Sequence, residues 1–111
     1  MSVALFAGLR VRDLDLAQPW YERLLGAPSS FPNETEVVWT LAEGRHVYIE
    51  EDPQLAGDGL VTVFVEDLEA VLSEIAGRGL EPAHHETYDN GVHKAVFVDP
   101  DGNQIGYGGA P

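Results

Sequence analysis

Hydrophobic and polar residues alternate in two similar stretches, and each stretch then changes to a helical pattern. Residues 8–14 read GLRVRDL and residues 62–68 read TVFVEDL. A period of two is typical of a strand, and the spacing near three and a half that follows Asp13 and Asp67 is typical of a helix. Each aspartate is therefore predicted to be an N-cap, whose carboxylate accepts hydrogen bonds from the first helical turn.

The text downstream of each aspartate keeps the same order of patterns. Apolar positions at helical spacing end at Gly26 in the first copy and within 77–79 in the second. Strands are predicted at 4–11, 36–41, 45–51, 60–65, 82–88, 92–98 and 104–107, an irregular or edge segment at 27–33, and a loose tail at 108–111. The chain is thus predicted to repeat one strand, helix and strands unit, as module one (1–52), a linker (53–59) and module two (60–108).

Size and charge limit what this repeat can do. A chain of 111 residues that is 44% hydrophobic suffices for one domain, so the two modules share a core with each other or with another subunit. The formal net charge of -13 argues against nucleic acid and anionic membranes as partners. It would attract a cationic ligand, although improved solubility is the simpler interpretation.

The sequence also restricts the compartment. It has no cysteine, which excludes disulfides and thiol chemistry and suits a reducing compartment. It has neither a secretory signal pattern nor an apolar run that could span a bilayer. We therefore expect a cytoplasmic protein.

Three motifs together resemble the vicinal oxygen chelate superfamily, which includes glyoxalases, extradiol dioxygenases and bleomycin-resistance proteins. They are LRVRDL at 9–14, WYERLLG at 20–26 and VFVDPDGNQI at 96–105. The resemblance covers nearly the whole chain and is weakest at 27–36. It implies an α+β fold in which two βαβββ modules form a curled, cup-shaped mixed sheet, with helices outside, a ligand site inside and a homodimer as the assembly.

The resemblance also implies where a metal would bind. In the enzymes of this superfamily, His, Glu or Gln side chains on the first and last strands of each module hold a divalent metal. Those positions fall here on Phe6, Tyr48, Leu60 and Gly106. Phe, Leu and Gly have no ligating side chain, and a phenol is an uncommon ligand for such metals. We therefore expect no metal and no other cofactor.

Strand alternation then suggests which side chains line the cup. The predicted ligand-binding residues are Phe6, Arg10, Trp39, Tyr48, Leu60, Phe64, Phe97 and Gln104. An aromatic cup would stack on a planar ligand. Arg10 would bind a carboxylate of that ligand or pair internally with Glu50, and the sequence favours neither.

The favoured function is metal-independent binding of a small molecule, such as sequestration of a drug or metabolite in antibiotic resistance. One alternative is a glyoxalase-like lyase, an isomerase or a dioxygenase with an atypical active site. Such an enzyme would either hold a metal through ligands at other positions or act without a metal, with His46 and Glu50 as candidates for a base and its orienting partner. Another alternative is a structural or regulatory dimer with a vestigial cup. His84, His85 and His93 could form a further site, but exposed imidazoles are the simpler interpretation.

Overall fold

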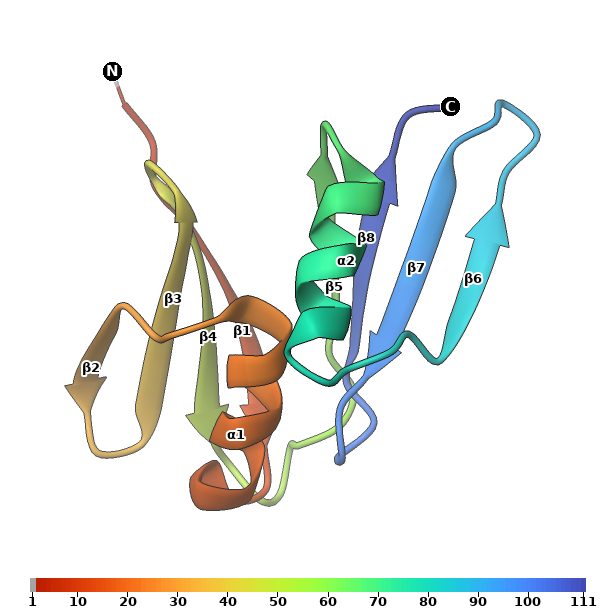
Figure 1. Cartoon of the computed structure of the whole chain (residues 1–111). Coiled ribbons are helices and arrows are strands. Elements are labelled where there is room, and N and C mark those ends of the chain that lie inside the picture. The colour runs from red at the N-terminus through yellow and green to blue at the C-terminus, as the bar shows by residue number, and fades with distance from the viewer. Residues whose placement is uncertain (1) are drawn as a thin grey trace.

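The computed structural model describes residues 2–111 and contains the predicted repeat (Figure 1). Met1, the first residue of predicted module one, lies outside the described residues. The first module consists of β1 (Leu5–Val11), α1 (Leu14–Leu25), β2 (Ser30–Asn33), β3 (Glu36–Ala42) and β4 (Arg45–Glu51). The second consists of β5 (Leu60–Val65), α2 (Leu68–Gly77), β6 (His84–Thr87), β7 (His93–Val98) and β8 (Gln104–Gly109).

Each module forms its own four-stranded sheet with the same topology. The strand orders are β1-β4-β3-β2 and β5-β8-β7-β6. The first strand of each module lies parallel to the last, and the other pairs are antiparallel. The predicted α+β class with two βαβββ modules is therefore confirmed. Neither helix in residues 2–111 has the length and apolar character needed to cross a membrane.

Both predicted helix caps are confirmed. Asp13 Oδ1 accepts a hydrogen bond from the N–H of Asp15 at 2.9 Å, and Asp67 Oδ1 accepts one from the N–H of Ala70 at 3.0 Å. These bonds satisfy N–H groups that have no partner within the helix, so the turn from strand to helix is fixed locally in both modules.

One hydrophobic core lies between the two sheets. Its buried members come from both modules and include Leu9, Tyr21, Leu24, Trp39, Val47, Ile49, Ile75, Phe97, Ile105 and Tyr107. The helices lie in the angle between the sheets (Figure 1). The helix-facing sides of the two sheets therefore face each other.

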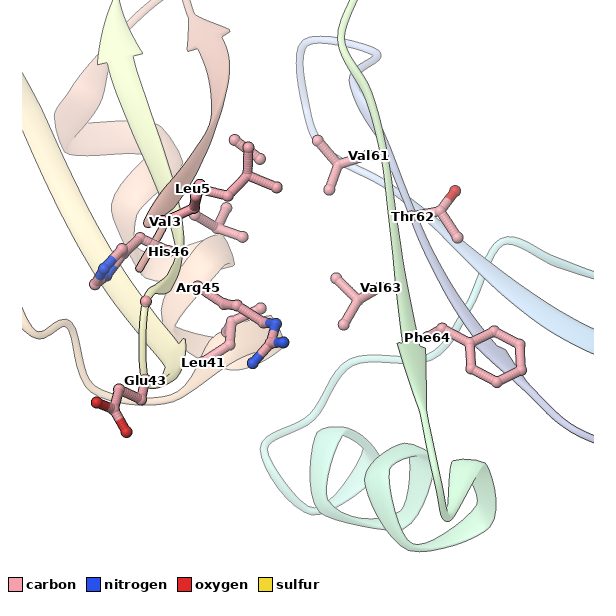
Figure 2. Close-up of a pocket in the computed structure, with 13 residues that line it drawn as sticks. Val3, Leu5, Leu41, Glu43, Arg45, His46, Val61, Thr62, Val63 and Phe64 are labelled. Atoms are coloured by element: carbon pink, nitrogen blue, oxygen red, sulfur yellow. The ribbon is translucent and has the colours of Figure 1, made fainter. Parts of the chain in front are cut away.

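The opposite sides of the two sheets point away from each other. Figure 2 shows Val61 and Val63 directed toward the first sheet, whereas Thr62 and Phe64 point away from it. We call these outward sides helix-free face one and helix-free face two. The strand registers assign Phe6, Gly8, Arg10, Glu36, Val38, Thr40, His46, Tyr48 and Glu50 to face one. They assign Leu60, Thr62, Phe64, Lys94, Val96, Val98, Gln104, Gly106 and Gly108 to face two. The sheets of one chain are therefore open and do not enclose a hollow between these two faces.

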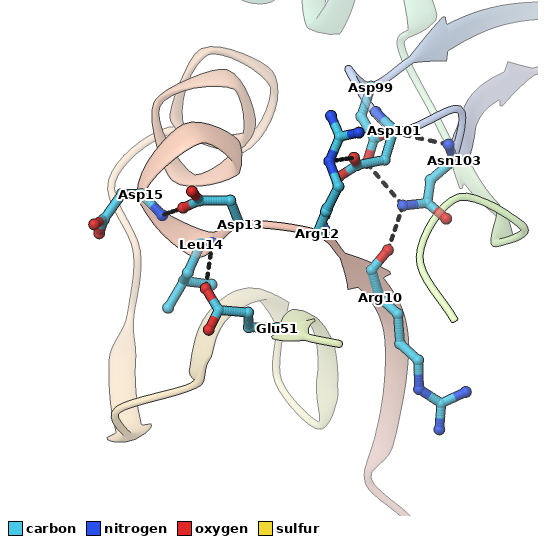
Figure 3. Close-up of polar contacts among 9 residues, drawn as sticks. All are labelled: Arg10, Arg12, Asp13, Leu14, Asp15, Glu51, Asp99, Asp101 and Asn103. Atoms are coloured by element: carbon cyan, nitrogen blue, oxygen red, sulfur yellow. Dashed lines mark hydrogen bonds and ion pairs between the residues drawn. The ribbon is translucent and has the colours of Figure 1, made fainter. Parts of the chain in front are cut away.

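A buried polar network joins the modules where β1 ends and β8 begins. Asn103 Nδ2 donates to the Arg10 carbonyl at 2.7 Å and to Asp99 Oδ2 at 2.8 Å (Figure 3). Asn103 Oδ1 accepts from the Gly59 N–H at 2.7 Å, and the Tyr21 hydroxyl donates to Asp99 Oδ2 at 2.6 Å. The 99–103 turn, which the sequence predicts only as a turn, thus also ties β1, α1 and β5 together.

The predicted loose tail is wrong for Gly108 and Gly109. Both residues continue β8, where Gly109 pairs with Val65 on one side and His93 on the other. A side chain at Gly109 would bring its Cβ within 2.7 Å of the Leu68 Cβ. Glycine is thus needed there for close packing against α2. In the sequence alone, the same glycines suggest a flexible tail.

Candidate functional site

Six of the eight predicted ligand-binding residues lie on the helix-free faces. Phe6, Arg10 and Tyr48 are on face one, and Leu60, Phe64 and Gln104 are on face two, because residues that pair across neighbouring strands share a side of the sheet. The two groups do not meet within a chain, since the faces point apart. Each face therefore carries three of the predicted residues.

Trp39 and Phe97 do not line either face, which corrects their predicted placement. Trp39 pairs with Val47 and Phe97 with Ile105, so both rings face the helices, and each is only 1% exposed. The Trp39 indole N–H donates to the Gly26 carbonyl at 2.8 Å. Apolar residues run together at 37–39 and at 95–98, so alternation could not assign a side there.

Face one carries a set of stacked and hydrogen-bonded rings. The Phe6 and His46 rings stack with centroids 4.2 Å apart and planes inclined by 15°. His46 Nδ1 lies 2.9 Å from the Thr40 hydroxyl. The Tyr48 ring lies across Gly8, where a Cβ would come within 2.5 Å of the Tyr48 Cζ. These side chains help to line a hollow of about 450 Å³.

The charged groups of face one pair with one another. Arg10 Nε lies 3.6 Å from Glu50 Oε2 and 3.7 Å from Asp52 Oδ2. Of the two predicted roles for Arg10, the structure thus shows internal pairing. Glu50 faces Arg10 and His46 contacts Thr40 and Phe6, so the base and orienting partner suggested for His46 and Glu50 are not bonded to each other.

Face two exposes apolar side chains beside a single lysine. Leu60 is 68% and Phe64 63% exposed. Lys94 crosses Gly106, where a Cβ would lie 2.3 Å from the Lys94 Cε, and Phe64 lies against Gly108. Sequence reasoning missed Lys94, because its side of β7 is defined only once β7 is aligned with β8.

The three histidines of module two do not form one site. His84 Nε2 lies 3.3 Å from Glu86 Oε2, whereas His93 Nδ1 lies 3.2 Å from the Thr87 hydroxyl. His85 pairs with Ala95 and so lies on the opposite side of β6 from His84. Within residues 2–111, no three His, Asp or Glu side chains are grouped so that they could hold a metal ion.

Glu86 also forms a short bond beside this strand. The Tyr88 hydroxyl donates to Glu86 Oε1 at 2.7 Å. This bond is the largest cause that lowers the pKa of Glu86 and raises the pKa of Tyr88. The Glu86 carboxylate is thus already engaged by two neighbours, the Tyr88 hydroxyl and the His84 ring.

A separate cleft of about 370 Å³ opens between the two sheets (Figure 2). Its apolar walls include Leu5, Leu41, Val61 and Val63, and Arg45 lies at its side. Most of these residues belong to the helix-facing sides, beyond the part that α1 covers. The predicted binding residues, apart from Phe64, do not line this cleft.

The fold has relatives among solved structures. The crystal structure of a glyoxalase/bleomycin resistance protein from Catenulispora acidiphila is 52% identical, with a TM-score of 0.93, over 99% of this chain and 100% of that one. This chain belongs to the glyoxalase/bleomycin resistance protein family. No family model matches the sequence, and no curated protein matches it.

Two less similar solved structures share the fold. A bleomycin-binding protein, solved in complex with bleomycin, is 20% identical with a TM-score of 0.76, and each chain is covered completely. A lactoylglutathione lyase from Agrobacterium tumefaciens is 21% identical with a TM-score of 0.72, over 98% of this chain and 94% of that one. At these identities the likeness concerns the fold alone, and the fold accommodates both a binding protein and an enzyme.

The metal positions implied by the family resemblance do not fit a metal here. The Phe6 ring stacks on His46, and the side chain of Leu60 offers no donor atom. Lys94, a cation, covers Gly106, and cations do not ligate a metal while protonated. Tyr48 is the remaining position, and one phenol cannot form a closed or catalytic coordination sphere.

Proposed function

We propose that this protein binds a small organic molecule, without a metal ion, in a hollow formed between two copies of the chain. The observation that carries the proposal is the composition of the two helix-free faces. They present large apolar side chains to solvent, with Phe6 54%, Leu60 68% and Phe64 63% exposed, together with a few polar groups. Such a mixture is typical of a ligand site or an interface and unusual for a free surface.

A twofold dimer would complete the site. Because the two faces of one chain point apart, face one can enclose a ligand only against another molecule. In a dimer with twofold symmetry, face one of each copy would meet face two of its partner, which gives two identical hollows. Charge supports this pairing, because the strand registers give Glu36 on face one and Lys94 on face two corresponding positions, and the two side chains have opposite charges.

The side chains on these faces suit a planar ligand. Phe6, Tyr48 and Phe64 offer ring surfaces for stacking, and Gln104 offers an exposed amide as an anchor. Binding alone would suffice for sequestration of a drug or metabolite. The related fold of the bleomycin-binding protein makes bleomycin the first compound to test.

The test combines assembly, metal content and binding. We expect light scattering to give a dimer, elemental analysis to give well under one metal ion per chain, and calorimetry with bleomycin and a panel of aromatic metabolites to give saturable binding. Phe64→Ala should weaken binding about tenfold. Phe31→Ala is the matched control, because Phe31 is 59% exposed on β2 outside both faces.

Several results would contradict the proposal. A monomer at all concentrations would remove the closed hollow. A stoichiometric transition metal would overturn metal independence, and an absence of binding across the panel would favour a structural dimer with a vestigial site. Equal effects of Phe64→Ala and Phe31→Ala would show that face two does not contact the ligand.

A further inference from the structure

The Lys94 side chain lies against face two, over a glycine of the neighbouring strand. Its side chain runs from β7 across Gly106 on β8, where a Cβ would lie 2.3 Å from Cε and 3.4 Å from Nζ. Its direct partner on β8 is also a glycine, Gly108. Gly106 and Gly108, which share one side of β8, thus provide the space in which the lysine lies against the sheet. Any larger residue at Gly106 would displace the lysine.

Lys94 forms no ion pair within residues 2–111, unlike Arg10, the other cation of the two faces. Arg10 on face one lies near both Glu50 and Asp52. Glu86 lies directly across from Lys94 on β6, yet no ion pair joins them among residues 2–111, and Glu86 bonds instead to Tyr88 and His84. Lys94 is half-buried, and the end of its side chain lies over Gly106. The hydrogen bonds of Glu86 to Tyr88 and His84 lower the pKa of Glu86, and the charge of Lys94 also helps to lower it, although less than these bonds do.

We propose that Lys94 is a specificity-determining residue that makes the ligand a planar aromatic carboxylate. Phe64 and Leu60 supply an exposed apolar surface beside the lysine, on which a flat ring can lie. Thr62, which pairs with Gly106, and Gln104, which pairs with Leu60, supply a hydroxyl and an amide on the same face. A carboxylate on the ring would meet the ammonium while these groups complete its hydrogen bonds.

The inference rests on the proposed function and narrows it. Among the positions at which the family resemblance implies metal ligands, Gly106 is the one that lies under a cation. The positive charge beside Gly106 is thus that of the Lys94 ammonium, which can bind an anionic oxygen directly. The preference for a carboxylate ligand is therefore attributed to Lys94, and it requires no bound metal ion.

The acidic surface does not oppose this local preference. The net charge of -13 disfavours anions at long range. Exposed charges more than about 8 Å apart are largely screened at physiological ionic strength, whereas a contact with Lys94 is not. A ligand with a single carboxylate is therefore compatible with the protein, and a polyanion is not.

The test uses three probes of one shape: 2-naphthoate, 2-naphthamide and 2-naphthylmethylammonium. Calorimetry on the full-length protein should give a dissociation constant for 2-naphthoate about tenfold below that for 2-naphthamide, with the ammonium probe weakest. Lys94→Met keeps the hydrocarbon stem and should abolish the difference between acid and amide. Arg45→Met, which makes the same change in net charge outside face two, should preserve it.

A second variant tests the position of the ammonium independently of its presence. Gly106→Ala should displace Lys94 and reduce the preference for the acid, because the new methyl group would meet only the far end of a flexible side chain. Equal affinities for acid and amide, or an unchanged preference in Lys94→Met, would overturn the inference while leaving small-molecule binding intact. A failure of all three probes to bind would overturn the inference together with the proposed aromatic-binding site.

Discussion

The two modules have the same topology but differ in which buried position carries a tyrosine. Module one has Tyr21 on its helix and Ile49 on its last strand, whereas module two has Ile75 on its helix and Tyr107 on its last strand. All four side chains lie in the one shared core. The tyrosine and the isoleucine have thus exchanged places between helix and strand. The exchange keeps the core filled although the two modules differ in sequence at both positions.

The helix-free faces differ far more than the core does. The registers align Arg10 with Phe64 and Glu36 with Lys94. A paired cation in module one thus corresponds to an exposed ring in module two, and an acid corresponds to a base. The helix-facing sides must fill a common volume, but the outward sides are free of that requirement. The comparison indicates that the fold was retained as a repeat while the chemistry of the two faces diverged.

The turns before the last strands diverge in the same way. The β7–β8 turn contains Asn103, which is 0% exposed and bonds to Arg10, Gly59 and Asp99. The β3–β4 turn contains the exposed Glu43. Of these two turns, only the β7–β8 turn is hydrogen-bonded to the other module among residues 2–111.

The largest expected effect in this comparison is that of Asn103→Ala. It would remove two partly buried hydrogen bonds, to the Gly59 N–H and the Arg10 carbonyl, and the buried one to Asp99, so we expect the free energy of unfolding to fall by about 3 kcal/mol. Urea denaturation followed by tryptophan fluorescence measures this. Glu43→Ala, a change in the corresponding turn of module one, should alter stability by less than about 0.5 kcal/mol. Equal effects would show that the turns do not differ in role.

A smaller effect should distinguish the two core tyrosines at alkaline pH. Burial is the largest cause that raises the pKa of Tyr107 to about 12, and Arg78 opposes that rise. The unfolded phenol ionises near pH 10, so the folded state is fully favoured below that pH and loses this contribution as the pH rises through 12. Tyr107→Phe should therefore flatten the decline in stability above pH 10, by on the order of 2 kcal/mol, with little change at pH 7.

Tyr21→Phe gives the contrasting result. Burial and then Asp99 raise the pKa of Tyr21, but its hydroxyl also donates to Asp99 at 2.6 Å. We expect this variant to be less stable at neutral pH by about 1 to 3 kcal/mol, because Asp99 loses a buried partner. Denaturation curves from pH 7 to 11 for both variants check this, and parallel curves would contradict the distinction between the tyrosines.

The sequence predicts the elements that depend on local patterns. Asp13 and Asp67 cap helices because a carboxylate at that position acts within one turn, and the alternation of β1, β4 and β5 assigns their sides correctly. Family motifs supply the rest of the topology. The runs around Trp39 and Phe97 are apolar throughout, so their sides depend on packing that no local pattern records.

The arrangement of the two sheets could not be predicted in the same way. Whether the helix-free faces enclose one hollow or point apart depends on the angle between modules, which Asn103 and the shared core set through contacts distant in sequence. The ammonium of Lys94 is another such case. Its position depends on what is missing at Gly106, a residue on a neighbouring strand.

The smallest expected effect is that of Arg10→Met, and it separates the two cations of the helix-free faces. The Arg10 side chain is 52% exposed, and its carboxylate partners lie 3.6 and 3.7 Å away, so the pairs contribute little to stability. We expect a change of at most about 0.5 kcal/mol in the free energy of unfolding. The preference for 2-naphthoate over 2-naphthamide should also persist, because two neighbouring acids already balance this guanidinium. Arg10→Met could instead abolish that preference as completely as Lys94→Met. That result would show that an ion-paired cation and an unpaired cation contribute equally to ligand choice, which contradicts the contrast drawn between the two faces.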